Sequence, residues 1–431
     1  MDKRRVVITG MGVISPLALT IEDFWNRLIA KEDGVRAWIP DRGTESPIAV
    51  AAPALFTGNI ADFDSRDTTQ QKAIRKALKV MSREIQMAVA ASCRALNEAE
   101  VTIGQFPADR VGISFGSDYI ITTVEDVLDG MKACFRPTSD GDKFDFSLWA
   151  DRGKPKMQPL WQLKYLPNMP GSHIAILNDF HGPSNSITLR EASIGACIGE
   201  SVEIIASNRA DLMLVGTTGS RLHSFKLIHA VQQEEIAENR CRPFDRNRDG
   251  TVLGEGAGAF VLEEYEHAVR RGAPIWAEVV CGSYRARYAK GRSDQRRQVV
   301  GAVLRDVLKR SGMEPDQIGH LNAHGLGSRA SDHAEAQGIN DVFGQRKKPI
   351  PVAAAKGFFG NLGAGAGAVE LAAGVLSLRH GHLFPTLHHK MPDTECPLNV
   401  ITATDIPAGD SMIKLAINVQ GQASAVLVRK I

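Results

Sequence analysis

The chain has 431 residues, of which 43% are hydrophobic and 23% are charged, and its net charge is +2. This composition is typical of a globular protein with a large buried core, and such a small net charge excludes nucleic-acid binding by bulk electrostatics. The longest weakly polar run contains Lys356, Asn361 and Glu370, so the sequence predicts no membrane span. The six cysteines form no CxxC pair, and we therefore expect reduced, cytoplasmic thiols rather than disulfides or a zinc site.

Short apolar runs alternate with longer helical patterns along the first part of the chain. We predict strands at residues 4–12, 110–117, 210–220 and 258–266, and helices at 72–96 and 201–210. Because the apolar runs do not alternate with polar residues, the strands are expected to be buried on both faces, which indicates an α/β sheet. Residues 120–170 are irregular and rich in Asp, Lys, Pro and Trp, and we interpret them as a cap over the first half.

A second series of elements repeats this order. It has predicted strands at residues 274–284, 318–325, 350–357 and 412–421, and predicted helices at 298–312 and 368–381. Each series contains a strand that ends in a glycine-rich turn and, later, a glycine-rich helix start. The repetition predicts an internal duplication, with halves at residues 1–263 and 264–431.

Two glycine-containing motifs resemble ligand-binding loops only in part. GEGAG at residues 254–258 precedes a predicted strand, whereas a dinucleotide fingerprint precedes a helix. The segment that starts at Asp245 begins like a calcium loop, but its twelfth position, which requires a bidentate Glu, is Gly256. We therefore predict tight packing at the first motif and a hydrogen-bonded turn at the second, and we expect no metal.

Several polar residues stand where a predicted strand or helix borders a glycine-rich loop. His324 ends an apolar strand, and Lys356 and Asn361 flank a glycine-rich helix start. Such residues can reach a pocket at the edge of a sheet, although a buried, hydrogen-bonded His and close helix packing would leave the same pattern. Asp332 and Glu335 follow nearby, and helix capping is a sufficient explanation for both.

A basic stripe occupies one face of the predicted helix at residues 72–96. It consists of Lys72, Arg75, Lys76 and Lys79. Such a stripe is usually a solvated face. Because like charges four residues apart destabilise a helix, docking of an acidic partner is the functional alternative.

Residues 187–199, ITLREASIGACIG, place Glu191 in a turn just before a long predicted helix. Such a turn is a common position for a nucleophile, because a helix N-terminus stabilises negative charge. Here the position holds a carboxylate. Cys197 lies six residues further along, nearly two helical turns away, and cannot take over this position.

Together these segments resemble the elongating β-ketoacyl-acyl-carrier-protein synthases nearly from end to end. The resemblance rests on RRVVITGMGVISPLA, on RPFDRNRDGTVLGEGAGAFVLEEYEHAVRRGAPIWAEV, and on NAHG and PTLHHKMPD in the same order and spacing. It implies a thiolase-like α/β fold of two similar halves in a five-layer αβαβα arrangement. It also implies a dimer, a tunnel that leads to a buried site, and no cofactor, since the substrate is carried on the phosphopantetheine of an acyl carrier protein.

The resemblance assigns five catalytic positions of the family to residues of this chain. Glu191 falls on the nucleophilic cysteine, His324 on the first histidine and Asn361 on the second. Lys356 and Glu370 fall on the supporting pair.

The same resemblance assigns the substrate contacts. Of the two Thr hydroxyls that meet pantetheine, one is replaced by Leu326 and the other by Ser328. The family's Gly/Phe-rich gating loop is shortened here to the run after Asn418, which contains Gly421 and Gln422 as expected substrate contacts.

A glutamate cannot form the family's acyl thioester, so these departures favour a non-condensing protein of fatty acid or polyketide-type biosynthesis, comparable to a chain-length factor or a regulatory homologue. Two catalytic alternatives are decarboxylation of malonyl groups through His324 and Asn361, and condensation by a mechanism that the sequence does not show. A scaffold with a closed pocket is a further alternative. The expected partners are an acyl carrier protein, at the basic stripe, and either a second copy of the chain or an intact synthase.

The protonation state of Glu191 bears on these alternatives. A helix N-terminus and the adjacent Arg190 favour the ionised form, whereas burial favours the protonated form. An ionised Glu191 would repel a malonyl carboxylate. We expect it to pair with a protonated His324.

Overall fold

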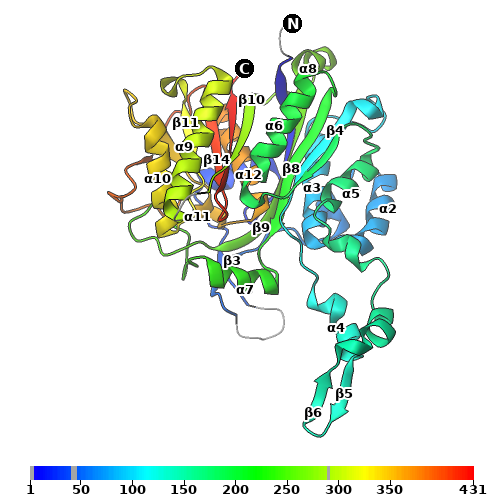
Figure 1. Ribbon diagram of the computed structural model, residues 1–431. Helices are drawn as coiled ribbons and strands as arrows, with labels where there is room; N and C mark the ends of the chain where they lie inside the picture. Colours follow the sequence, from blue (N-terminus) through cyan, green and yellow to red (C-terminus); the bar gives the residue numbers. More distant parts are fainter. Residues whose placement is uncertain (1–3, 40–45, 289–291) are drawn as a thin grey trace.

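A computed structural model describes residues 4–39, 46–288 and 292–431 (Figure 1). Its main sheet has two wings, which join where β1 (Val6–Ile14) pairs with β10 (Ala277–Ala286). From its edge inward, the first wing contains β7 (Ser184–Ile187), β4 (Val111–Gly116), β8 (Leu212–Ser220), β9 (Leu253–Glu264) and β1. The second wing contains β13 (Asn399–Val400), β12 (Pro351–Ala353), β11 (His320–Asn322), β14 (Ser411–Ile417), β15 (Gln422–Arg429) and β10.

Both wings have the same strand order. The short strands β2 (Arg36–Ala37), β3 (Val50–Ala52) and β13 are additions at the margins. If the other strands are numbered along the chain within each half, both wings read 3-2-4-5-1 from edge to centre. In each wing the second strand lies parallel to its two neighbours. The shared order confirms the prediction of two similar halves.

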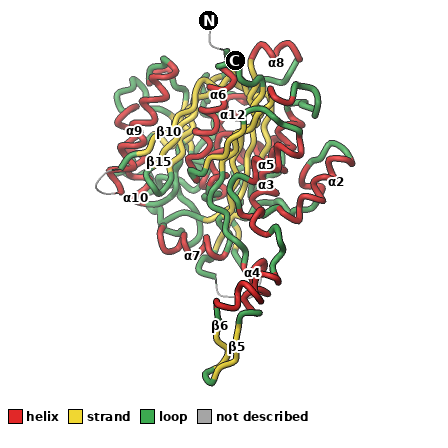
Figure 2. The backbone as a smooth tube through the Cα atoms, turned by 45° about the vertical axis from the view of Figure 1, so that its right-hand side comes forward, coloured by secondary structure: helices red, strands yellow, loops and turns green. Residues whose placement is uncertain are grey.

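Helices form three further layers (Figures 1 and 2). α3 (Arg83–Glu98) and α5 (Met169–Asn178) cover the outer face of the first wing. α9 (Arg292–Ser311) covers the outer face of the second wing, and α10 (Arg329–Phe343) packs against α9. α6 (Ser193–Ala206) and α12 (Ala364–His380) lie between the wings, where α6 contacts β8 and β10 and α12 contacts β9 and β14. This is the predicted five-layer αβαβα arrangement, and it explains why the central strands are apolar on both faces.

The remaining helices surround this frame. They are α1 (Ile21–Ile29), α2 (Thr68–Ala77), α7 (Ser224–Gln233), α8 (Tyr265–Arg271) and α11 (Lys356–Phe359). The helix predicted at residues 72–96 is in fact two helices, because α2 ends before Met81 and α3 starts after Ser82, whose hydroxyl accepts a hydrogen bond from the amide of Ile85. No helix within the described ranges combines the length and the apolar character that a membrane crossing requires.

The two glycine motifs have structural roles. GEGAG lies inside β9, and α12 approaches it so closely that a Cβ atom on Gly365 would lie 2.0 Å from the carbonyl oxygen of Gly256. The Asp245 carboxylate accepts hydrogen bonds from the backbone amides of Asn247, Lys390 and Met391. The predictions of tight packing and of a hydrogen-bonded turn are therefore confirmed. Among the described residues, no three His, Cys, Asp or Glu side chains form a group that could hold a metal ion.

Residues 124–165, which we name the arm, project away from the body of the molecule (Figures 1 and 2). The arm contains α4 (Val124–Lys132), the hairpin of β5 (Phe135–Thr138) and β6 (Gly141–Phe144), and short helical turns up to Tyr165. The prediction that residues 120–170 form a cap over the first half is therefore wrong, because the arm does not lie over it (Figures 1 and 2). The arm has buried residues of its own, Cys134, Leu148 and Met157, so it does not need the body to cover its centre.

Candidate active site

Glu191 lies in the predicted turn between β7 and α6. Arg190 adopts a left-handed backbone conformation with φ 52°, which is costly for a residue with a side chain and turns the chain sharply. A short 3₁₀ turn over Arg190–Ala192 then leads into α6 at Ser193. The turn directs Glu191 inward, and its side chain is 2% exposed.

Four residues of the second half surround this turn, as the sequence predicted. His324 follows β11, Lys356 begins α11, Asn361 follows α11, and Glu370 lies within α12. All four are buried. The Asn361 amide nitrogen donates a hydrogen bond to the Glu191 carboxylate at 3.0 Å, while the Asn361 oxygen accepts one from the amide of Gly363 at 3.0 Å. These two bonds fix the orientation of the Asn361 amide.

Lys356 links His324 to Glu370. Its ammonium group lies 3.1 Å from His324 Nδ1, donates to the His324 carbonyl oxygen at 2.9 Å, and pairs with the Glu370 carboxylate at 2.5 Å. A second buried lysine, Lys414, pairs with the other Glu370 oxygen at 2.6 Å. Lys414 was not among the predicted site residues, although a single lysine in the middle of the apolar strand MIKLAI was a usable signal.

His324 is neutral. Burial lowers the pKa of its imidazole well below the ordinary value, and the positive charges of Lys356 and Lys414 lower this pKa further. Because the Lys356 ammonium donates to Nδ1, the ring proton is assigned to Nε2. The expected ion pair between Glu191 and a protonated His324 is therefore wrong, because burial and the nearby lysines keep the imidazole neutral.

Glu191 belongs to a group of buried and half-buried charged residues, which we name the charge cluster: Asp118, Arg190, Glu191, Arg221 and Glu234. Arg190 Nε lies 3.6 Å from the carboxylates of both Asp118 and Glu191. Arg221 makes two hydrogen bonds to Glu234, at 3.0 and 2.5 Å, and Arg190 lies 3.5 Å from Glu234. Although burial alone would raise the pKa of the Glu191 carboxyl, the charges of Arg190 and Arg221 outweigh it and lower this pKa below its usual value. Glu191 is ionised.

Asp332 and Glu335 hold the loop that follows His324. Glu335 accepts hydrogen bonds from the amides of His324, at 2.6 Å, and Gly325, at 2.9 Å, and Asp332 accepts one from Gly327 at 3.0 Å. Burial raises the pKa of Asp332 to about 6 and that of Glu335 to about 7. Helix capping is therefore the wrong explanation for both, because the loop folds back over α10 and presents its own amides. The cap of α10 is Ser328, which accepts from the amide of Ser331.

The space between these residues is very small. A cavity of about 10 Å³ is lined by residues of both halves, namely Glu191, Glu234, Arg296, His324, Leu326, Ser331, Asn361, Ile417, Asn418 and Val419. This volume holds about one water molecule. The residues that were predicted to be catalytic lie together here, but this conformation leaves no room for an acyl chain or a pantetheine arm.

The predicted substrate contacts lie outside this cavity. Ser328 caps α10, and Gly421 and Gln422 belong to the tight turn between β14 and β15. Asn418 closes this turn, since its side-chain oxygen accepts from the amide of Gln422 at 3.1 Å and its side-chain nitrogen donates to the Leu189 carbonyl at 3.0 Å. The shortened loop thus ties the second half to the turn of Glu191. Cys197 is buried, and burial raises the pKa of its thiol to about 12, so it is no nucleophile.

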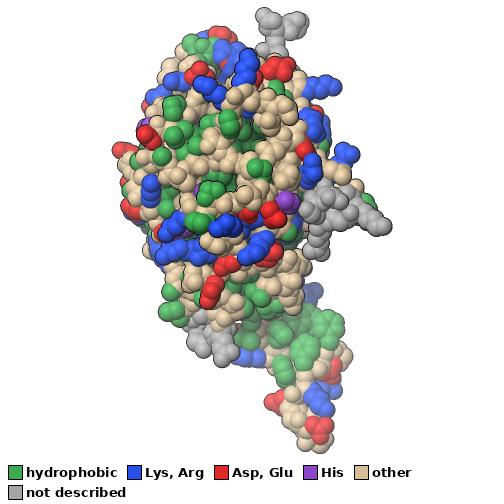
Figure 3. All heavy atoms as spheres, turned by 90° about the vertical axis from the view of Figure 1, so that its left-hand side faces the viewer, with side chains coloured by type: hydrophobic (Ala, Val, Ile, Leu, Met, Phe, Trp, Pro, Cys, Tyr) green, Lys and Arg blue, Asp and Glu red, His purple; other side chains and the backbone are tan. Residues whose placement is uncertain are grey.

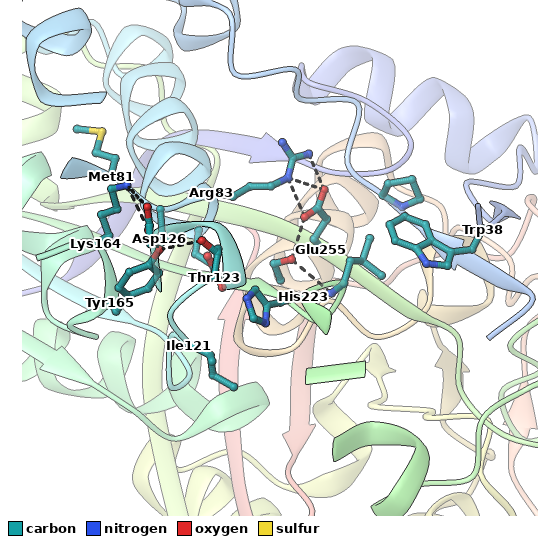
Figure 4. A pocket seen from close by; sticks show the side chains of 15 residues that line it. Trp38, Met81, Arg83, Ile121, Thr123, Asp126, Lys164, Tyr165, His223 and Glu255 are labelled. Carbon is teal, nitrogen blue, oxygen red and sulfur yellow. Dashed lines mark hydrogen bonds and ion pairs between the residues drawn. The ribbon is translucent and has the colours of Figure 1, made fainter. Parts of the chain in front are cut away.

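A larger cavity of about 530 Å³ lies between the base of the arm and the body (Figure 4). Its charged side chains pair with one another: Arg83 contacts Glu255 at 2.5 Å, and Lys164 and Tyr165 both contact Asp126. None of the predicted catalytic residues lines it. The basic stripe lies apart from both cavities on α2 and the following turn, where Lys72, Arg75, Lys76 and Lys79 are all exposed.

The sequence is similar to known proteins over almost its whole length. Residues 3–268 match the family "Beta-ketoacyl synthase, N-terminal domain", and residues 278–390 match "Beta-ketoacyl synthase, C-terminal domain". The 3-oxoacyl-[acyl-carrier-protein] synthase 2 of Coxiella burnetii is 30% identical over 408 residues, which cover 93% of this chain and 92% of that protein. The protein of the same name from Synechocystis sp. is 29% identical over 418 residues, with the same coverage of both chains.

Solved structures share the fold. The ishigamide ketosynthase/chain length factor matches with a TM-score of 0.84 and 24% identity, and the match covers all of both chains. A Beta-ketoacyl synthase from Burkholderia phymatum also gives a TM-score of 0.84 at 24% identity, over 99% of this chain and all of the other. A type II ketosynthase in complex with its acyl-carrier protein gives 0.82 at 22%, over all of both chains. The fold is thiolase-like, and the chain belongs to the β-ketoacyl synthase family.

Proposed function

We propose that this protein is a non-condensing member of its family, comparable to a chain-length factor or a regulatory homologue of fatty acid or polyketide-type biosynthesis. The observation that carries the proposal is the state of Glu191. At the position that the resemblance assigns to the nucleophile, this carboxylate is ionised, hydrogen-bonded to Asn361 and beside Arg190. One oxygen of this carboxylate is therefore already occupied by the amide of Asn361 without a substrate.

The chemistry of a carboxylate supports this proposal. Condensation in this family needs a thiolate that accepts the acyl group as a stable thioester. An acyl group on Glu191 would instead be an anhydride, which water hydrolyses readily. The cavity of about 10 Å³ supports the same conclusion, and its walls include the charged Glu234 beside Glu191, which an apolar acyl chain would have to desolvate.

Decarboxylation of a malonyl group is the second candidate. His324, with its proton on Nε2, and the Asn361 amide are two donors that could hold an enolate oxygen. Two observations weigh against it. The Asn361 amide already donates to Glu191, and the negative charge of Glu191 would repel the malonyl carboxylate that has to enter.

The proposed partners are an acyl carrier protein and a second subunit. The exposed basic stripe on α2 suits an acidic carrier, and one structural neighbour is a ketosynthase in complex with its acyl-carrier protein. The second subunit is a further copy of this chain or an intact synthase. It has a place to pair, because β7 forms one end of the main sheet and has no second neighbouring strand among the described residues.

Mass spectrometry tests the proposal. The protein is incubated separately with acyl-loaded and malonyl-loaded carrier protein, and an ordinary cysteine-dependent synthase serves as the positive control. We expect neither an acylated form of this protein nor an acetyl-carrier product. An acetyl product would establish the decarboxylase instead, and a covalent acyl adduct or a 3-oxoacyl product would refute the non-condensing assignment.

A further inference from the structure

α7 and the residues on either side of it form a distinct part of the body, at the end from which the arm projects (Figure 1). We name residues 221–234 the α7 segment. Before it, β8 pairs with β9 as far as Ser220, and after it Ile236 pairs with Thr251. Between these anchors, residues 222–234 make no backbone-to-backbone hydrogen bond to the rest of the described chain.

The apolar contacts of the α7 segment are few. Among its apolar residues only Leu227 and Ala230 are buried, and they pack in a small cluster with residues of β3 and β9, apart from the larger hydrophobic clusters of the fold. On the same helix, Phe225, Ile228 and Val231 are 45%, 48% and 41% exposed. A segment with so few buried apolar contacts can open locally at a lower free-energy cost than the core.

Charged contacts hold the segment instead, and they belong to the charge cluster. Arg221 and Glu234 lie at its two ends and are joined by the hydrogen bonds of 3.0 and 2.5 Å, so that the segment is closed on itself. Arg190, in the turn that presents Glu191, lies 3.5 Å from the same carboxylate of Glu234. The segment is therefore tied to the turn of Glu191 by charge.

Two further contacts hold the helix itself. The Lys226 ammonium pairs with Glu84 at 3.2 Å, and His229 Nδ1 lies 3.2 Å from the Tyr119 hydroxyl. None of these four residues lines the cavity beside Glu191. Contact between the segment and this site therefore depends on its ends.

The ends of the segment form part of the wall around Glu191. Glu234 lines the cavity of about 10 Å³, and Arg221 packs against the loop before α12, where a Cβ atom on Gly363 would lie 3.3 Å from Arg221 Cγ. The side chains of Arg221 and Glu234 are both 5% exposed. A movement of Glu234 away from Arg221 would remove this part of the wall and open the cavity.

We infer that the α7 segment is a lid over the site of Glu191 and that the pair of Arg221 and Glu234 is its latch. The inference rests on the proposed function, because it names the contact that keeps the site of a non-condensing protein closed. A buried ion pair fixes geometry but adds little net stability, whereas loss of one partner leaves the other charge buried and unpaired. Loss of Glu234 should therefore favour the open lid.

Hydrogen–deuterium exchange of the full chain tests the lid with two matched variants. Glu234→Gln removes the carboxylate of the latch. Asp341→Asn is the control, because Asp341 also accepts two hydrogen bonds from one arginine, Arg297, at 2.9 and 2.8 Å, but is exposed. This pair joins α10 to α9 on the face shown in Figure 3, where positive and negative side chains are interspersed. We expect the amides of α7 to exchange at least about tenfold faster in Glu234→Gln, with α3 and α12 unchanged, and Asp341→Asn to match wild type.

Alkylation measures whether the site opens together with the segment. In the background of Glu191→Cys, iodoacetamide labelling at position 191 reports access to the site, since the six native cysteines are all buried. Addition of Glu234→Gln should raise this labelling rate at least about tenfold, whereas addition of Asp341→Asn should leave it unchanged. If Glu234→Gln does not fold, Arg221→Lys takes its place, because it keeps the charge but loses the paired hydrogen bonds.

The outcomes separate the lid from the proposed function. Unchanged exchange of α7 refutes the lid, and so does equally faster exchange of α7, α3 and α12, since the segment then does not move on its own. Faster exchange of α7 without faster alkylation refutes the segment as a cover of the site. A wild type that forms a 3-oxoacyl product refutes the proposed function, while faster exchange and alkylation in Glu234→Gln would still establish the lid.

Discussion

At the scale of single residues, Glu191 owes its charge to surroundings drawn from both halves of the fold. It precedes α6, and Asn361 precedes α12, which is the equivalent helix of the second half. The positive ends of helices stabilise a carboxylate, and Arg190 and Arg221 add full charges. Removal of the negative charge therefore removes one of the three carboxylates that lie beside Arg190.

Glu191→Gln should destabilise the protein by about 1–3 kcal/mol, because it removes one of the three carboxylates beside Arg190, while Asp118 and Glu234 remain to balance the two arginines. Glutamine keeps the acceptor for Asn361, so the loss is a loss of charge rather than of shape. Urea denaturation measures the effect. The control is Glu203→Gln, at a carboxylate that is 50% exposed, which should change stability by less than about 0.5 kcal/mol. Equal stability of both variants would show that the charge cluster does not depend on Glu191.

At the scale of elements, the sequence predicted those features that depend on hydrophobic periodicity and on the order of segments along the chain. Buried strands, the repeated series and the turn at Glu191 were all visible as local patterns. The break between α2 and α3 was not, because a serine cap replaces the glycine or proline that usually marks a helix end. The charge cluster was also missed, since Asp118, Arg221 and Glu234 follow three different elements and meet only in the folded chain.

The residues of the site were predictable from the sequence, but their protonation states were not. The resemblance placed Glu191, His324, Lys356, Asn361 and Glu370 together. Sequence spacing does not report burial or the nearest charges, and these decide that His324 is neutral and Glu191 ionised.

The loop after β11 should make stability depend on pH through Glu335. Its pKa is about 7 in the folded protein and 4.5 as the ordinary value, so the folded state binds the proton more tightly than the unfolded state. The stabilisation of the folded state by protonated Glu335 is therefore complete below about pH 4.5 and is lost as the pH rises through 7. The stability of wild type relative to Glu335→Gln should therefore fall by about 2 kcal/mol between pH 5 and pH 8.

Denaturation midpoints of both proteins across this pH range provide the measurement. Glu238→Gln, at an exposed position, is the control and should follow the wild-type curve. A constant difference between wild type and Glu335→Gln would mean that Glu335 does not take up a proton on folding. Because Asp332 lies close by with a pKa of about 6, part of the effect belongs to the pair.

At the scale of the whole molecule, the outer surface of the fold and the buried site beside Glu191 can have separate functions. The repeated strand order and five layers are those of the family, and the basic stripe on α2 lies on the outside of that frame. The charge cluster fills the interior beside Glu191. A carrier protein could therefore bind from outside even while the cavity beside Glu191 is small, since docking depends on the surface and not on the cavity.

Under the proposed function, the basic stripe should steer an acyl carrier protein whether or not condensation follows. Reversal of two charges, Lys72→Glu with Arg75→Glu, should slow association at least about tenfold at low salt, because steering by a charged patch raises association rates by this order or more. The difference should shrink as salt approaches 0.15 M, where the Debye length is about 8 Å. The matched control, Lys347→Glu with Lys348→Glu, changes the net charge equally at an exposed site outside the stripe. Stopped-flow association rates decide between the two functions of the stripe: equal rates for both double variants would make it a solvated face, whereas selective slowing of the α2 variant would establish it as the docking surface for the carrier.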